Sequence, residues 1–146
     1  MPRPDRTLTA VYTRDVRDSN IWRIGPDGHA QTIITSTRED MSPQFSADGT
    51  MLAFVSSRTG ALEIWTSRAD GSNPLQITSF GGIDVHAPRW SPDGRKLAFA
   101  ARPEGHGDVF VVGSAGGEPV RLTRDPSQDV LPSWSRDGQW IYPRQG

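Results

Sequence analysis

The amino-acid sequence predicts an all-β protein, a β-propeller of four-stranded antiparallel blades, with about three blades in this chain. Three observations lead to this prediction: a repeat of 45 residues, short apolar or β-branched runs within each repeat, and hairpin-type turn residues between the runs. A period of this length with four strands per unit is typical of a propeller blade. Helical repeats are disfavoured because the apolar residues alternate with a period of two.

The repeat aligns without a gap: residues 43–78 match residues 88–123 at an offset of 45, with eleven identical pairs. The pattern begins again at Pro132, and an earlier partial copy contains Trp22. We therefore expect five segments. They are a disordered or extended N-terminus over 1–7, an incomplete blade over 8–41 with its last three strands, complete blades over 42–86 and 87–131, and the start of a further blade over 132–146.

Each complete blade is expected to contain four strands, a to d in chain order. In the blade over 87–131 they are PRWS, KLAFAA, DVFVVG and PVRLT. A Ser-Pro-Asp-Gly turn joins strands a and b, and a Gly-Gly pair joins c and d. Proline presets a negative φ and glycine accepts a positive one, as tight hairpins require. The aromatic residue that recurs in strand a is expected to fill the space between neighbouring blades; it is Phe45, Trp90 or Trp134.

Composition excludes several classes of protein. The chain has 16 Lys and Arg against 17 Asp and Glu, a net charge of -1, which disfavours nucleic acid as a partner. It has no Cys, so disulfide scaffolds and thiol nucleophiles are excluded. The longest apolar runs are strand-sized, so we expect no membrane span. The first residues lack the apolar region of a signal peptide.

The run over 88–99, followed by Gly105, 109–111 and 121–123, resembles the WD40-like PD40 repeat of TolB-type β-propellers. The resemblance extends over nearly the whole chain, with departures at Ala47 and Arg136, which replace the turn proline, and at Pro143 in strand b.

The resemblance implies a six-bladed propeller used mostly as a non-catalytic binding scaffold. In TolB this scaffold docks a peptidoglycan-associated lipoprotein in the bacterial periplasm, so a periplasmic or extracytoplasmic location is implied. Related repeats also occur in prolyl-oligopeptidase-like peptidases, sensor regions of transcriptional regulators and some lyases. A propeller enzyme, or the propeller domain of one, is therefore the alternative function.

Three blades and a remainder do not close a ring, since known propellers have about four to eight blades. Either the chain is a piece of a longer propeller, or two copies form a homodimer that closes a six-bladed ring. In the homodimer, strand a around Trp134 completes the first blade of the second copy. However, residues 140–142 duplicate the strand b already present at 8–13, and Pro143 is expected to end that redundant strand.

Antiparallel strands place the a–b and c–d turns on one face of the ring and the b–c and d–a loops on the other. The latter are longer and more varied, so we expect a protein or peptide partner to bind there. The candidate binding residues are Asp40, Asp84, His86, Arg89, His106, Asp108 and Asp129.

Two interpretations of these residues stay open. Asp40, Asp84 and Asp129 each precede the proline of strand a, where they form an acidic ring at the channel mouth or accept hydrogen bonds that fix the chain entry. His86 and His106 lie near carboxylates that would suit a divalent metal. Because the surrounding spacing matches no ligand pattern, we expect no metal and no cofactor. The chain also lacks Gly-x-Ser-x-Gly, HExxH and P-loop motifs, so no catalytic residue is expected here.

Overall fold

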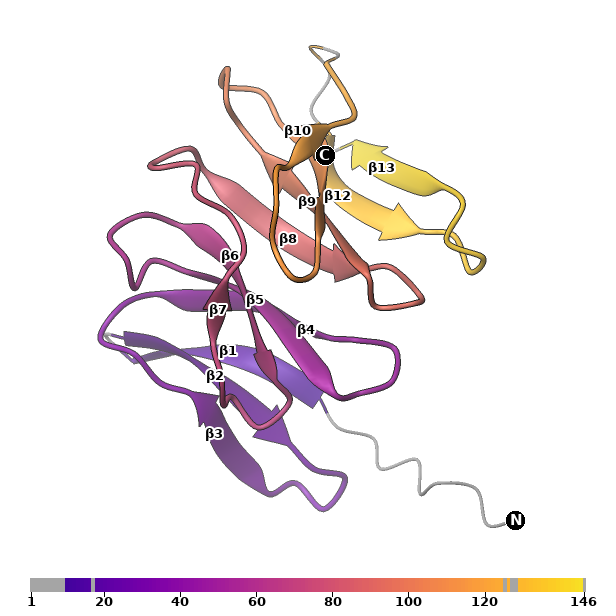
Figure 1. The fold of residues 1–146 in the computed structure, drawn as a ribbon. Helices are drawn as coiled ribbons and strands as arrows, with labels where there is room; N and C mark the ends of the chain where they lie inside the picture. Colours follow the sequence, from indigo (N-terminus) through magenta and orange to yellow (C-terminus); the bar gives the residue numbers. More distant parts are fainter. Residues whose placement is uncertain (1–9, 17, 125, 127–128, 146) are drawn as a thin grey trace.

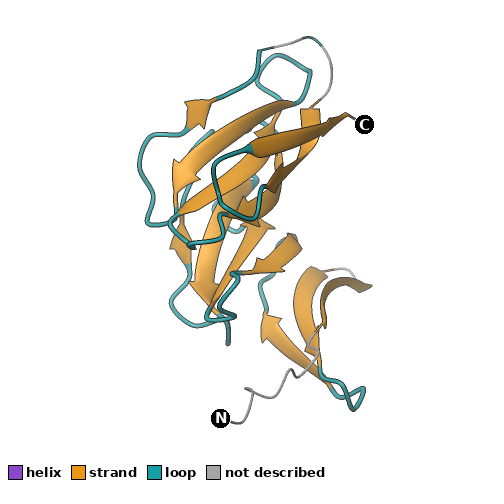
Figure 2. Cartoon of the chain, turned by 90° about the vertical axis from the view of Figure 1, so that its right-hand side faces the viewer, coloured by secondary structure: helices purple, strands orange, loops and turns teal. Residues whose placement is uncertain are grey.

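The structure is a computed structural model that describes residues 10–16, 18–124, 126 and 129–145. These residues form thirteen β-strands in four antiparallel sheets, and they include no helix (Figures 1 and 2). Accordingly, no helix of the described part is long and apolar enough to cross a membrane. The prediction of an all-β, blade-like architecture is confirmed.

The first sheet holds β1 (Ala10–Val16), β2 (Asp18–Ile24) and β3 (Ala30–Ile34), in that order. By their place in the repeat, these three strands correspond to strands b, c and d. The b–c loops are expected to be long, but the β1–β2 ladder of this sheet runs as far as the pair Val16 and Asp18. The ladder joins backbone groups, and a polar run such as this one can therefore continue a hairpin.

The next two sheets are complete four-stranded blades, with their strands hydrogen-bonded in chain order. The last sheet is a hairpin of two strands. The second sheet contains β4 (Asp40–Phe45), β5 (Met51–Ser56), β6 (Glu63–Arg68) and β7 (Leu75–Gln76). The third contains β8 (Val85–Trp90), β9 (Lys96–Ala101), β10 (Asp108–Gly113) and β11 (Val120–Arg121), and the hairpin contains β12 (Asp129–Trp134) and β13 (Ile141–Gln145).

The first strand of each blade begins earlier than the sequence predicts. β4, β8 and β12 start at 40, 85 and 129, whereas the expected boundaries are 42, 87 and 132. In two blades a residue in the left-handed region stands before the proline: Ser42 has a φ of 52° and Ala87 one of 54°. The ladder to the neighbouring strand shifts register at these residues. This bulge carries the strand past the proline, so the strand extends on both sides of it.

Pro143 lies inside β13, directly opposite Pro132. The Ser135 N–H donates to the Trp140 carbonyl at 2.9 Å, and antiparallel pairs alternate from there between bonded and non-bonded positions. The two prolines therefore form a non-bonded pair, in which neither N–H would have joined the two strands. The expectation that Pro143 ends this strand is wrong, because the hairpin needs no donor there.

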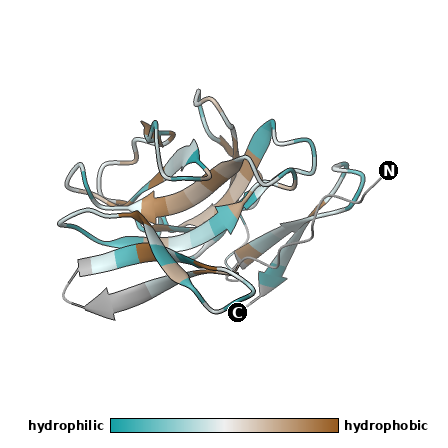
Figure 3. Ribbon diagram, turned by 90° about the horizontal axis from the view of Figure 1, so that it is seen from below, coloured by the Kyte–Doolittle hydropathy of each residue, from teal (hydrophilic) through white to brown (hydrophobic). Residues whose placement is uncertain are grey.

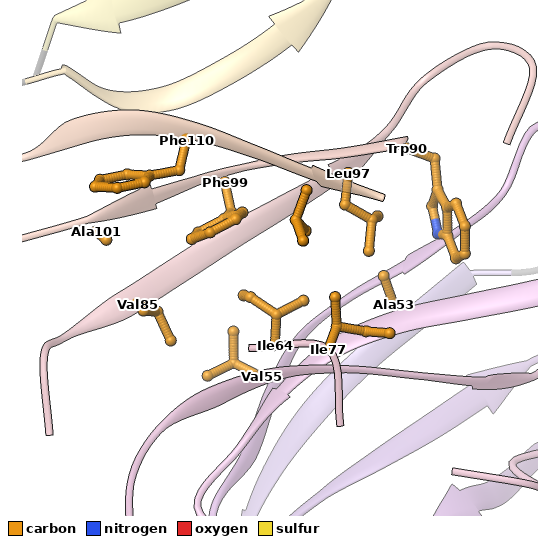
Figure 4. Packing of buried hydrophobic residues seen from close by; sticks show 11 residues of the cluster. Ala53, Val55, Ile64, Ile77, Val85, Trp90, Leu97, Phe99, Ala101 and Phe110 are labelled. Atoms are coloured by element: carbon orange, nitrogen blue, oxygen red, sulfur yellow. The ribbon is translucent and has the colours of Figure 1, made fainter. Parts of the chain in front are cut away.

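The hydrophobic core lies between neighbouring blades. Alternate residues of β5 face opposite sides: Leu52 and Phe54 pack on the first sheet, and Ala53 and Val55 on the third. The larger cluster joins the second and third sheets and includes Trp90, as expected for the strand-a aromatic (Figure 4). Apolar residues concentrate in the central strands and hydrophilic ones in the loops (Figure 3). The central strands are thus buried on both sides, which makes the blades a stiff frame.

Candidate functional site

The ladder register separates the ends of the strands into two faces. Val85 pairs with Ala101, so the loops before β8 and after β9 lie together; we call the surface of the b–c and d–a loops the loop face. Trp90 pairs with Leu97 at the other end of the same strands. We call that surface, which carries the a–b and c–d turns, the turn face.

Asp40 is fully buried at the loop-face end of β4. Its Oδ1 accepts a hydrogen bond from the Arg58 guanidinium at 3.0 Å, and its Oδ2 accepts one from the Ser36 hydroxyl at 2.7 Å. Arg58 also lies over the rings of Phe54 and Trp65, with its Cζ 5.2 and 4.9 Å from their centres. These contacts fit the interpretation in which the aspartate fixes the chain entry, because its charge is already paired inside the protein.

Asp84 occupies a different position from Asp40. In the third sheet Val85, not Asp84, takes the buried ladder position at the start of the strand, and Asp84 is exposed just before it. Asp129 begins β12, but its side chain lies outside the described residues. Of the three aspartates predicted to form an acidic ring, Asp84 is therefore the one that the described residues show open to solvent.

His86 lies next to this exposed aspartate in β8 and is partly buried. Burial lowers its pKa below the ordinary value of 6.5, nearby Arg102 lowers it further, and the Asp84 carboxylate acts in the opposite direction. Burial of the His86 imidazole thus favours its neutral form.

His106 and Asp108 belong to one charged cluster, which also contains Glu104 and Arg121. Arg121 Nη2 lies 2.6 Å from Asp108 Oδ2, and Arg121 Nη1 lies 3.3 Å from Glu104 Oε1. His106 Nδ1 and Nε2 lie 3.4 and 3.5 Å from the same two carboxylate groups. The hydrogen bond from Arg121 lowers the pKa of Glu104. The structure brings the two predicted residues together, while Arg121 is a partner that sequence reasoning missed.

Asp108 has a counterpart in the preceding blade, Glu63, at an offset of 45 residues. Both carboxylates are buried at the first position of strand c. The Glu63 carboxylate accepts hydrogen bonds from the Thr78 hydroxyl at 2.5 Å and from the Gly81 N–H at 2.9 Å. Thr123 stands at the matching place in the third sheet, 3.4 Å from Asp108. The signal for this recurrence was present in the repeat alignment, in which Thr78 and Thr123 are identical.

Among the residues that the structure describes, no group of three or more His, Asp or Glu side chains is arranged to hold a metal ion. Near His106 the two carboxylates are already paired with the Arg121 guanidinium. That positive charge opposes the approach of a cation.

Arg89 lies on the turn face, not on the loop face where binding was expected. It lines a groove of about 590 Å³, bounded by the ends of β4, β8 and β12, which also contains Arg136. Two indoles of the groove join neighbouring blades. Trp90 Nε1 donates to the Gln44 carbonyl, and Trp134 Nε1 donates to the Arg89 carbonyl, each at 3.0 Å. The groove therefore runs across a repeated blade-to-blade contact.

The chain is similar to known propeller proteins. It is 45% identical over 49 residues to a TolB homolog from Chlorobium luteolum, a match that spans 33% of this chain and 11% of that protein. A TolB-type structure from Agrobacterium tumefaciens aligns with a TM-score of 0.76 and 26% identity, over 94% of this chain and 55% of that one. TolB from Acinetobacter baumannii aligns with a TM-score of 0.78 and 25% identity, over 91% of this chain and 34% of that one.

The chain thus spans about half or less of the length of these relatives. The same fold, at 18% identity and a TM-score of 0.66, also occurs in an oligogalacturonate lyase, so the fold alone does not decide between scaffold and enzyme. The protein-family model of the TolB beta propeller domain matches residues 4–144 of this chain. Together with the four-stranded blades and their repeated contacts, this match shows that the chain belongs to the TolB β-propeller family.

Proposed function

We propose that this chain is part of a propeller that acts as a non-catalytic scaffold for a protein or peptide partner, which contacts the b–c and d–a loops of the loop face. The proposal rests on one observation: buried carboxylates at the loop-face ends of the blades bind neighbouring groups and hold the loops in place. They belong to Asp40, Glu63 and Asp108. Loops anchored in this way are already ordered, so binding costs little conformational entropy. The TolB relationship supports an extracytoplasmic location, which we include in the proposal.

The probe for this proposal is the purified soluble domain of a bacterial peptidoglycan-associated lipoprotein, the partner that the TolB resemblance implies. We expect it to bind, and we expect Asp84→Lys to weaken binding by about fivefold, since Asp84 is exposed and exposed charge pairs contribute up to about 1 kcal/mol. Asp129→Lys is tested beside it, and a loss of binding is expected there too. Titration calorimetry measures the affinity. The matched control is Glu118→Lys, which reverses an exposed charge on the turn face.

Absence of binding by the unmodified chain, or equal loss in the Glu118→Lys control, overturns the loop-face assignment. Early thermal unfolding of the aspartate variants does so as well, because it identifies their carboxylates as structural.

We also propose that two copies of the chain complete a ring. Among the described residues, the first sheet has no strand a, the innermost strand of a blade, whereas the last sheet has one in β12. The two sheets lie at opposite ends of the molecule (Figure 1). Three large apolar side chains of the terminal hairpin are exposed: Leu131 at 39%, Trp140 at 66% and Tyr142 at 56%. Such a surface is seldom left open in a soluble protein.

Closure places β12 of one copy beside β1 of the second. Both β1 and β13 are second strands of a blade, so β13 must give up its place beside β12. Two measurements test this proposal: the mass of the protein in solution, and the effect on dimerisation of removing β13.

A further inference from the structure

The turn-face groove contains two arginines, Arg89 and Arg136, for which the described residues provide no carboxylate partner. Arg89 is partly buried, and the hydrogen bond that its guanidinium makes goes to the carbonyl of its neighbour Pro88, at 2.9 Å. Arg136 is exposed. Within the described part of the chain, neither side chain forms an ion pair. Burial lowers the pKa of Arg89, as expected for a cation that is short of compensating charge. Most donors of both guanidinium groups are thus available to a ligand.

The aspartates of the a–b turns, Asp48, Asp93 and Asp137, do not line the groove. Each accepts a hydrogen bond from the serine two residues earlier, at 2.7, 2.7 and 2.6 Å, and another from the backbone N–H two residues later. All of these bonds go to Oδ1, so one oxygen of each carboxylate is held within its own turn.

The remaining wall of the groove is aromatic. Trp90 and Trp134 line it, and both indole N–H groups are already used in the bonds to the neighbouring blade. Trp90 is largely buried in the core, whereas Trp134 is partly exposed and offers a ligand ring surface, which suits an apolar side chain. The polar groups of Gln44 and Ser133 lie beside them.

We propose that this groove binds a peptide segment that carries a carboxylate next to an apolar side chain, with the carboxylate on Arg89 and Arg136 and the apolar group against Trp134. A guanidinium and a carboxylate match in charge and in hydrogen-bond geometry. The site lies on the opposite face from the loops of the proposed function and does not depend on them.

The test uses the full chain and two capped synthetic peptides, acetyl-Glu-Leu-Glu-Leu-Glu-amide and its counterpart with glutamine in place of glutamate. We expect the acidic peptide to bind and the neutral one to bind at least about tenfold more weakly. Arg89→Gln and Arg136→Gln should each weaken the acidic peptide by about tenfold. The matched control, Arg38→Gln, removes an exposed arginine in the d–a loop of the loop face and should leave the affinity unchanged.

Equal binding of the two peptides, or equal loss in the Arg38→Gln control, overturns the proposal. So does tighter binding of a short single-stranded oligonucleotide, which would show that the groove selects phosphate. Should Arg89→Gln impair folding, Arg136→Gln still decides, because that side chain is exposed and has no described partner. Asp84→Lys should not change the affinity for the acidic peptide. The proposal for the groove and the proposal for the loop face are therefore tested independently.

Discussion

A serine and an aspartate close each a–b turn. Ser46 Oγ donates to Asp48 Oδ1 at 2.7 Å, and the same oxygen accepts the Thr50 N–H at 3.0 Å. Ser46 Oγ in turn accepts the Met51 N–H at 3.1 Å. The corresponding bonds occur in the next two a–b turns. The turn therefore depends on the serine and aspartate, which explains why Ala47 is tolerated in place of the usual proline.

These bonds predict an acid-dependent contribution to stability. They lower the pKa of Asp48 from 3.8 to about 2, chiefly through the Ser46 hydroxyl. A depressed pKa in the folded state stabilises the fold above the unfolded value and loses this effect as pH falls through the folded value. Asp48→Asn should therefore lower the melting temperature at pH 7, and the difference from the unmodified chain should shrink between pH 4 and pH 2. Thermal denaturation across this range measures it, and a difference independent of pH would contradict the argument.

Gly71 is the glycine that the blade-to-blade contact requires. It has a φ of 87°, and a Cβ at this position would lie 1.9 Å from the Ile33 carbonyl oxygen of the first sheet. Gly71→Ala should destabilise the protein by about 2 kcal/mol or more, since strain and overlap act together. Gly28→Ala is the control: its φ is 81°, but no atom lies within 4 Å of the added carbon. Chemical denaturation compares the variants, and equal losses would show that strain alone decides.

A repeated side-chain hydrogen bond joins the first strands, strands a, of successive blades. The indole of one strand donates to the carbonyl just before the aromatic residue of the preceding strand, from Trp90 to Gln44 and from Trp134 to Arg89. The side chain of Phe45 has no N–H group, so it cannot form such a bond. Repetition of this bond sets the spacing between blades beyond what burial of apolar area provides, because hydrogen bonds are directional.

Trp134→Phe should keep most of the buried aromatic area and lose the bond to Arg89. We expect a loss of about 1 kcal/mol, which corresponds to a fall of about 3 °C in melting temperature. Trp140→Phe, which changes an indole that is 66% exposed, should have a smaller effect. Calorimetry decides, and equal shifts for the two variants would show that the Trp134 hydrogen bond contributes nothing.

On the scale of the whole molecule, the two ends of the chain are unequal. In the described part of the chain, the first sheet has no strand a, while the terminal hairpin exposes an apolar surface. The described strands of these two sheets are complementary parts of one blade, so a second copy can supply each with a neighbour. This is the basis of the proposed ring.

The ring predicts a solution mass of twice the 16.0 kDa of one chain. Because β13 competes with β1 for β12, a variant that lacks residues 141–146 should dimerise more tightly. Light scattering during size-exclusion chromatography measures both, over a range of protein concentrations. A monodisperse monomer for both forms would contradict closure by a second copy.

Much of the fold could be predicted because each repeat contains the residues that determine local structure. Turn residues and period-two runs act over a few neighbouring positions, so the strands and blades follow from the sequence. The bulges at Ser42 and Ala87 could not be predicted, since neither is a glycine and their positive φ is visible only in the backbone. Likewise, Pro143 is compatible with its strand only because of the pair it forms with Pro132.

The residues of the repeat are enough to predict the blade as the unit of this protein, the order of its strands and two faces with different loops. Which of the described charged side chains are paired follows only from the packing of the blades. Asp40 is neutralised by Arg58 and Glu104 by Arg121, whereas Arg89 and Arg136 come together in a groove. The physical reason is separation along the chain: these partners are 17 to 47 residues apart, and the packing of the blades sets their distance.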